Sequence, residues 1–349
     1  MLSKFLQKMM TKEQTIKILR NLDSQEIDEI FKKADQVREK IFQDEVHLRA
    51  IIEISNFCVK DCVYCGLNKK NTKLQRYRME QDEILKAAEK AASFGFKTIV
   101  IQSGEDPLIS SDFVGQTISK IKQKFDVAVT LSLGERKIGD FEKWKELGAD
   151  RYLLKFETSD LALYKKTHPS MKKVANNRIQ LLKKLKEIGY EAGSGIMVGL
   201  PFQNYESLVE DLFLMSELDL DMIAIGPYIP HKETLFSRYL DKIEIKEIEK
   251  TTLLLISLAR ILNPTANIPS TTALSVLDPE EGRVMGLKCG ANVIMPDLTP
   301  EPYKSMYEIY DGKTKSKEWD ICEQEKLLSA LRSIGRKPSL TKGFRKKLH

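Results

Sequence analysis

Apolar and polar positions follow two different periods along the chain. Before residue 46, Ile16, Leu19 and Leu22 recur at the three- and four-residue spacing of an amphipathic helix, and a second helix is predicted over 25–42. From residue 46 onward, short β-rich runs alternate with amphipathic stretches. This alternation predicts parallel βα units that follow a helical N-terminal segment.

The predicted strands cover 48–55, 98–103, 127–133, 151–157, 191–197, 222–225, 267–271 and 292–295. The predicted helices between them cover 81–94, 113–124, 141–147, 174–188, 205–217 and 245–262. Parallel strands connected in this way favour an α/β fold, a (β/α)8 TIM-type barrel, over a doubly wound open sheet. We expect an N-terminal helical extension (1–45), the barrel (46–300) and a C-terminal extension with a basic tail (301–349).

The predicted strands carry charges on one face. Arg49 and Glu53 share a face of the first strand, and Arg151 and Glu157 share a face of the fourth. A barrel filled with branched apolar residues would not show this pattern. Because a buried charge needs an opposite charge or a ligand, we expect a polar lumen that binds a charged ligand. The alternative is a set of ion pairs inside the barrel, Arg49 with Glu53 or Arg151 with Glu157.

The composition is that of a globular protein. Of the 349 residues, 42% are hydrophobic and 30% are charged, which excludes wholesale disorder. The 56 basic and 50 acidic residues are mostly interspersed, so we predict no nucleic-acid partner, and no apolar run is long enough for a membrane span. Five cysteines are too few for a disulfide scaffold, which favours a reducing cytoplasm. The basic and apolar N-terminal residues are predicted to form a surface helix rather than a targeting peptide.

Three of the cysteines, Cys58, Cys62 and Cys65, follow the first predicted strand directly, at the end of a barrel where active sites form. Three thiolates so close in sequence can bind one metal centre. A structural zinc ion prefers a fourth protein ligand, and no second pair follows at zinc-finger spacing. An iron–sulfur cube held by three cysteines leaves one iron open, and that iron can bind a small molecule.

The Cys-x3-Cys-x2-Cys spacing, with Tyr64 before the last cysteine, resembles the motif of the radical S-adenosylmethionine (SAM) superfamily. The resemblance implies one 4Fe–4S cluster on Cys58, Cys62 and Cys65, with SAM bound to the open iron. It also implies reductive cleavage of SAM to a 5′-deoxyadenosyl radical inside a (β/α)8 barrel. Residues that match SAM-binding positions of the superfamily or its members are Tyr64, Gly104, Glu105, Ser132, Glu157, Arg178 and Tyr303.

Some of these positions have simpler explanations. Gly104 and Glu105 also suit an ordinary βα turn, Arg178 suits a solvated helix surface, and Tyr303 suits an exposed position. His231, after the sixth predicted strand, is expected to be a hydrogen-bonded loop histidine rather than a ligand of metal or substrate.

Longer segments resemble the HydE family of FeFe-hydrogenase maturases, over about residues 46–310, with methylornithine synthase and biotin synthase as relatives. These segments are 132–135, 151–154, 156–158, 226–231, 268–272 and 289–296. The resemblance implies assembly of the two-iron subcluster of the hydrogenase H-cluster, on a cysteine-bound iron carbonyl cyanide substrate. It implies an anion-binding, substrate-binding pocket at Arg49, Arg151, Thr271 and Thr272, although β propensity alone also explains the two threonines.

The partners implied by the resemblance are other hydrogenase maturases, namely a scaffold GTPase and a tyrosine-cleaving radical SAM enzyme. An electron donor such as ferredoxin or flavodoxin is also implied. Two other functions stay open, a methylornithine synthase-like aminomutase and a non-catalytic iron–sulfur carrier. Some HydE proteins hold a second cluster on three C-terminal cysteines, but that region here contains only Cys322, so we expect one cluster. Cys289 is expected to be a small buried residue.

Overall fold

The computed structural model describes residues 10–21, 23–169, 177–242, 245–315 and 318–347. A parallel sheet of eight strands forms its centre, in the order β6-β5-β4-β3-β2-β1-β8-β7. A parallel bridge between Met222, at the start of β6, and Asn267, just before β7, brings the two ends of the sheet together. The fold is therefore the predicted α/β barrel, and a doubly wound open sheet is excluded.

The strands are β1 (Glu45–Ser55), β2 (Thr98–Ser103), β3 (Ala128–Ser132), β4 (Arg151–Leu153), β5 (Glu191–Val198), β6 (Met222–Pro227), β7 (Pro269–Ser270) and β8 (Val293–Ile294). The helices around them are α4 (Gln81–Ser93), α5 (Ser111–Lys124), α6 (Ile138–Glu146), α7 (Leu161–Thr167), α8 (Asn177–Ile188), α9 (Tyr205–Glu217), α10 (Ile245–Leu262), α11 (Thr272–Leu277) and α12 (Gly282–Lys288). No helix among the described residues is long and apolar enough to cross a membrane.

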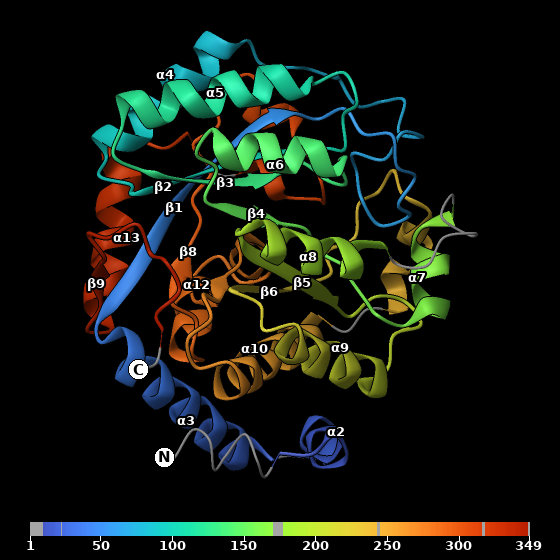
Figure 1. Ribbon diagram of the computed structural model, residues 1–349. Coiled ribbons are helices and arrows are strands. Elements are labelled where there is room, and N and C mark those ends of the chain that lie inside the picture. The colour runs from blue at the N-terminus through green and yellow to red at the C-terminus, as the bar shows by residue number, and fades with distance from the viewer. Residues whose placement is uncertain (1–9, 22, 170–176, 243–244, 316–317, 348–349) are drawn as a thin grey trace.

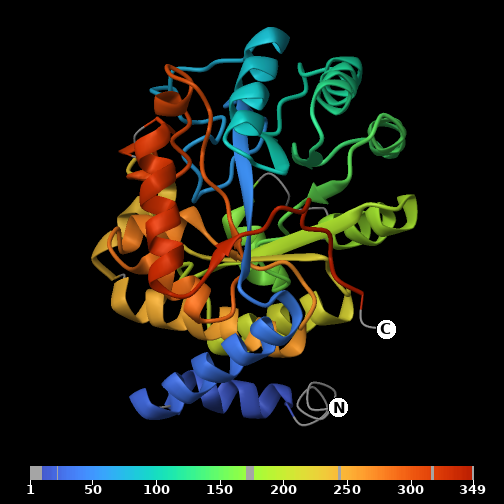
Figure 2. The same ribbon diagram turned by 90° about the vertical axis from the view of Figure 1, so that its left-hand side faces the viewer.

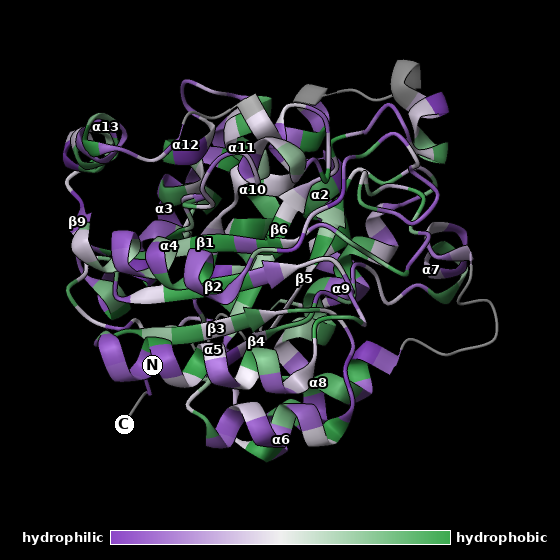
Figure 3. Ribbon diagram, turned by 90° about the horizontal axis from the view of Figure 1, so that it is seen from above, coloured by the Kyte–Doolittle hydropathy of each residue, from purple (hydrophilic) through white to green (hydrophobic). Residues whose placement is uncertain are grey.

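Hydrophobic faces of strands and helices build the core between the two layers. Ala50, Ile52 and Ile54 of β1 are buried there, together with Ile84 and Ala88 of α4. Seen from above, the outer helices alternate hydrophilic and hydrophobic positions around the strands (Figure 3). This period places the polar side of each helix toward water.

Two helices precede the barrel. α2 (Lys12–Asn21) packs on α9, and α3 (Ser24–Phe42) packs on α10 (Figures 1 and 2). Asp23 caps α3 by accepting a hydrogen bond from the backbone N–H of Glu26, whose own side chain bonds back to the cap. Ion pairs from Arg20 to Glu206 and from Lys12 to Glu210 connect α2 to α9. These contacts lie on the outer side of the helical layer.

Strand β4 is shorter than the pattern predicts. It ends at Leu153, four residues before the expected end, although the backbone N–H of Glu157 still donates to the carbonyl oxygen of Gly195. Glu157 has a φ of +65°, a left-handed conformation that regular strands exclude. The chain therefore leaves the strand geometry before it reaches the cavity. The expected start of α8 at 174–176 falls outside the described residues.

The C-terminal segment wraps one side of the barrel. α13 (Ile321–Ser333) is followed by β9 (Lys337–Pro338), which pairs with the start of β1 (Figure 2). Beyond β9, the carbonyl oxygen of Lys342 accepts a hydrogen bond from Arg151, and that of Gly343 accepts one from Arg49. The tail therefore crosses the amino-terminal ends of the strands.

Candidate active site

A cavity of about 350 Å³ lies at the carboxyl-terminal ends of the strands. It brings together most of the predicted site residues, namely Cys58, Cys62, Tyr64, Cys65, Gly104, Glu105, Ser132, Glu157, Arg178, Thr271 and Thr272. A larger hollow of about 930 Å³ lies between α6 and α8, but it contains none of the cysteines. The smaller cavity is therefore the candidate active site.

The three cysteines of the motif are free thiols at one wall of this cavity. Burial raises the pKa of Cys58, and it raises the pKa of Cys62 to about 12. For Cys65, burial and the nearby Cys62 and Cys58 raise the pKa well above its usual value. One buried and two partly buried thiols this close together are stabilised as thiolates by a positive metal centre, and they are the donor set that an iron–sulfur cluster requires.

Gly104 lets the loop after β2 approach the cysteine loop. Its N–H donates to the carbonyl oxygen of Ser55, and a Cβ at this position would clash with the carbonyl oxygen of Phe57. Below it, Asp106 accepts hydrogen bonds of 2.7 Å from the hydroxyl of Ser55 and from Arg78. The loop that carries Cys58 is therefore held against the end of β2.

Charged side chains alternate along the cavity next to the cysteines. Lys60 lies 3.0 Å from Glu105 and 3.3 Å from Glu135, and Arg178 donates to Glu135 at 3.1 Å. Glu157 forms a further ion pair with a neighbouring lysine at 3.0 Å. Arg178 is 8% exposed, so the structure excludes the alternative of a solvated helix arginine. Such an arrangement suits a ligand that carries both an ammonium and a carboxylate.

Tyr64 is positioned by a histidine. Its hydroxyl lies 3.0 Å from Nε2 of His168, and the two rings meet edge to face at 5.5 Å. Burial lowers the pKa of His168 to about 3, so this imidazole is neutral. The phenol of Tyr64 therefore has a fixed orientation at the cavity wall.

Another part of the cavity wall comes from α11 and from the segment after residue 300. Thr271 and Thr272 line it, and the hydroxyl of Thr271 is buried without a hydrogen-bond partner. Tyr307, Tyr310 and Lys313 also line it and were missed in the sequence. The only sequence feature that could have indicated Tyr307 and Tyr310 is the group of tyrosines between residues 303 and 310.

Tyr303 is placed away from the cavity, which corrects the sequence prediction. Its hydroxyl donates to Glu83 of α4 at 2.8 Å, and its ring packs on Tyr77. The short 3-10 turn at Lys304–Met306 directs the following Tyr307 to the cavity instead. This segment therefore places Tyr307 and not Tyr303 at the cavity.

Arg49 and Arg151 are not brought into this cavity either. Arg151 is the first residue of β4, and Arg49 pairs in register with Thr98, the first residue of β2. Both therefore lie toward the amino-terminal end of the barrel, opposite the active site. Arg151 forms an ion pair with Glu191 at 2.6 Å and a hydrogen bond to the tail at Lys342. Arg151 is thus paired, as the alternative held, but with Glu191 rather than with Glu157. Arg49 forms no ion pair with any described residue and donates instead to the tail carbonyl oxygen of Gly343.

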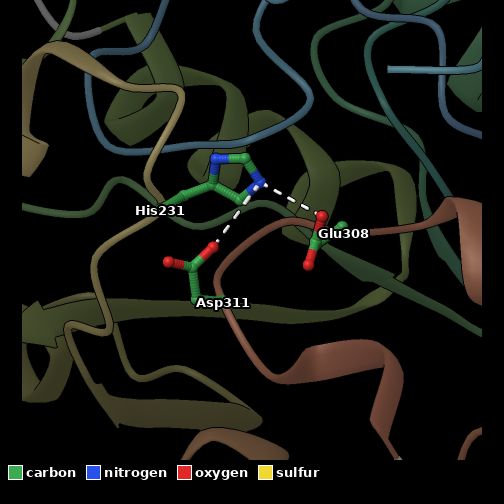
Figure 4. A group of neighbouring side chains, drawn as sticks. All are labelled: His231, Glu308 and Asp311. Carbon is green, nitrogen blue, oxygen red and sulfur yellow. Dashed lines mark ion pairs between the residues drawn. The ribbon is translucent and has the colours of Figure 1, made fainter. Parts of the chain in front are cut away.

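His231, Glu308 and Asp311 form a separate cluster beside Gly66 (Figure 4). Nε2 of His231 lies 3.5 Å from Glu308 and 3.9 Å from Asp311. The other ring nitrogen, Nδ1, accepts a hydrogen bond from the backbone N–H of Glu233 at 3.1 Å. Nε2 is therefore the ring nitrogen that faces the two carboxylates, and it forms no hydrogen bond with the described residues.

Comparison with known proteins agrees with this site. Residues 52–215 match the Radical SAM superfamily, and this range contains the cysteine motif and the first strands of the barrel. Fold and site together define a radical SAM enzyme, whose cofactors are a 4Fe–4S cluster and SAM. Cys58, Cys62 and Cys65 fit the cluster.

The FeFe hydrogenase maturase subunit HydE of Thermotoga maritima is 48% identical over 319 residues, which are 91% of this chain and 89% of that protein. The chain belongs to the HydE family. The 3-methylornithine synthase of Methanosarcina barkeri is 27% identical over 94% of this chain and 91% of its own. A crystal structure of methylornithine synthase (PylB) covers 97% of both chains with a TM-score of 0.83 at 24% identity, which confirms the fold.

The other two cysteines lie elsewhere. Cys289 is fully buried in the core after α12, as expected for a small structural residue. Cys322 is exposed on α13. Neither residue lines the cavity that holds the cysteine motif.

Proposed function

We propose that this protein cleaves SAM reductively and directs the radical at a cysteine-bound iron carbonyl cyanide substrate. The product would be a precursor of the two-iron subcluster of FeFe hydrogenase. The observation that carries the proposal is the 48% identity to a HydE protein across 91% of the chain. The cavity with three cysteines and a ring of paired charges supports it.

When bound, the cluster and SAM supply a 5′-deoxyadenosyl radical through one-electron cleavage of a carbon–sulfur bond. In our proposal Lys60 and Arg178 meet the carboxylate of SAM, and Glu105 and Glu157 meet its ammonium group. Tyr64, oriented by a neutral histidine, lies against the adenine. The lining of the cavity is mostly apolar in area, which limits the water near a radical that attacks indiscriminately.

We assign substrate binding to the part of the cavity wall that Thr271 and Thr272 form. The unpartnered hydroxyl of Thr271 is a group that a polar ligand would satisfy. Arg49 and Arg151 are left out of this assignment, because backbone carbonyls of the tail already accept their hydrogen bonds.

The proposed partners are the other maturases of the pathway, a scaffold GTPase and a tyrosine-cleaving radical SAM enzyme. The proposed compartment is the reducing cytoplasm, where three free thiolates stay available for the cluster. The two partners follow from membership of the HydE family, and the compartment follows from the chemistry of cysteine.

Rescue of hydrogenase maturation tests this function. A strain that lacks its own HydE gene but keeps FeFe hydrogenase should regain hydrogen evolution when this chain is expressed. The Cys62→Ser variant, expressed at the same level, should not restore it. If the wild-type chain fails while the purified holoenzyme converts lysine, the aminomutase is the function. If the holoenzyme forms no 5′-deoxyadenosine from SAM, the chain is a carrier.

A further inference from the structure

Exposed apolar side chains gather at one end of the barrel. Of the eight large hydrophobic residues that are exposed in the described parts of the chain, five follow strands at the active-site end: Val59, Leu108, Leu161, Phe202 and Leu235. Leu161, Phe202 and Leu235 are 51%, 54% and 57% exposed. Exposed apolar groups concentrated near an active site mark a surface that another protein covers.

Leu161, Phe202 and Leu235 lie on three segments that contact one another. Phe202 follows β5, and its ring meets Phe236 and Tyr239 of the 3-10 helix η2 (Leu235–Lys242) edge to face. Nζ of Lys166, on α7, lies 4.4 Å from the centre of the Phe202 ring. These contacts join α7, the β5 loop and η2 into one surface.

Three exposed cations lie on the same elements as these apolar groups. Lys165 and Lys166 are exposed on α7, and Arg238 is exposed on η2. We call the set Leu161, Lys165, Lys166, Phe202, Leu235 and Arg238 the α7–η2 patch. An apolar centre with a cationic border is complementary to an acidic protein surface.

The same two elements bond directly to the cysteine loop. The N–H of Val63, between two cluster cysteines, donates to the carbonyl oxygen of Thr167 at the end of α7 at 3.0 Å. The carbonyl oxygen of Val63 accepts from the N–H of Phe236 in η2 at 3.1 Å. The patch therefore lies on two segments that each form a backbone hydrogen bond with the cysteine loop.

We infer that the α7–η2 patch is the docking surface for an acidic one-electron carrier protein that reduces the cluster. In this step one electron passes from the reduced carrier to the cluster, the carrier is oxidised by one electron, and no proton or leaving group moves. The inference depends on the 4Fe–4S cofactor and on reductive cleavage of SAM, but not on the identity of the substrate.

The choice of reductant separates docking from catalysis. The Lys165→Glu, Lys166→Glu double variant should raise the Kd for flavodoxin, measured by titration calorimetry, and KM for reduced flavodoxin by about tenfold or more, because charge reversal opposes an acidic partner. With dithionite, which needs no docking, the same holoenzyme should form 5′-deoxyadenosine at the wild-type rate. Raised salt should weaken flavodoxin-driven turnover of the wild type and affect the double variant less.

Two further variants complete the test. Lys32 and Lys33 are an exposed pair on α3, so Lys32→Glu, Lys33→Glu carries the same charge change and should leave KM for flavodoxin unchanged. Leu235→Ser removes apolar area without changing charge and should also raise that KM while dithionite turnover persists.

Three outcomes overturn the inference. An unchanged KM in the α7 double variant means that flavodoxin docks elsewhere. An equal loss with dithionite means that the lysines support the fold or the cysteine loop. If the α7 double variant shows normal kinetics with flavodoxin but no longer supports hydrogenase maturation, the patch binds a maturation partner instead. Failure of maturation rescue by the wild type bears only on the proposed substrate, because the flavodoxin and dithionite measurements are made without it.

Discussion

Nη2 of Arg151 donates a hydrogen bond of 2.7 Å to the backbone carbonyl oxygen of Lys342, so the first residue of β4 holds the C-terminal tail. The guanidinium also pairs with Glu191 at 2.6 Å, and its side chain is fully buried. Phe344 of the tail stacks near it, with its ring centre 4.6 Å from the guanidinium carbon. Arg151 therefore lies in the lumen and binds the C-terminal tail at the amino-terminal ends of the strands.

Replacement of this arginine should lower stability and spare chemistry. Arg151→Ala leaves Glu191 and the tail carbonyl without their partner, and we expect a loss of about 3 kcal/mol in the free energy of unfolding. Urea unfolding measures it. Lys183→Ala, on an exposed position of α8, should change that free energy by less than about 0.5 kcal/mol. If the Arg151→Ala variant kept full stability but lost substrate turnover, Arg151 would instead be a substrate-binding residue.

Serine at any cysteine of the motif should remove the cluster. A Cys58→Ser, Cys62→Ser or Cys65→Ser variant keeps the side-chain volume close but loses the thiolate that iron requires. After anaerobic reconstitution, we expect loss of bound iron and of 5′-deoxyadenosine formation together. Cys322→Ser changes an exposed cysteine outside the cavity and should retain both. Retained cleavage in a motif variant would contradict the ligand assignment.

A methyl group at Gly104 should displace the cysteine loop. In Gly104→Ala the new Cβ meets the carbonyl oxygen of Phe57, so backbone must move next to Cys58. We expect weaker cluster retention and at least a tenfold loss of SAM cleavage, about 1.4 kcal/mol in transition-state stabilisation. Gly139→Ala places a methyl in open space near the start of α6 and should be neutral or stabilising by up to about 1 kcal/mol. Equal activity of both variants would refute the close approach.

The stability of the protein should depend on the ionisation of Asp211. Burial raises the pKa of this carboxyl, on α9, to about 7, although Ser159 donates a hydrogen bond to it. The unfolded chain loses the proton near pH 4 while the folded chain keeps it to about pH 7. Folding therefore becomes less favourable as pH rises between these values, by about 3 kcal/mol from pH 5 to pH 8.

Asp211→Asn removes this titration. The free energy of unfolding of the variant should gain on that of the wild type as pH rises from 5 to 8, as measured by urea unfolding at each pH. A constant difference between the two proteins across this range would show that Asp211 ionises in the folded state as it does in the unfolded one.

The alternation of β-rich and helical stretches was sufficient to predict the barrel, because each βα unit shows its own hydrophobic periodicity in the sequence. The cysteine motif needs only a short loop after β1, so its place in the site is a local property. Gly104 and Glu105 follow β2 directly, and Glu157 comes four residues after β4. Parallel strands deliver such residues to one edge. These positions could therefore be read from the chain.

Only the tertiary structure decided which residues from distant segments join them. Tyr307, Tyr310 and Lys313 reach the cavity because the segment after β8 folds back over it, and no periodic pattern encodes that path. Arg151 was misplaced for a related reason. Strand alternation shows that its side chain enters the lumen, but not that the tail, almost two hundred residues later, supplies its hydrogen-bond acceptor. Local periodicity determines which face a side chain takes, whereas its partner depends on how the whole chain packs.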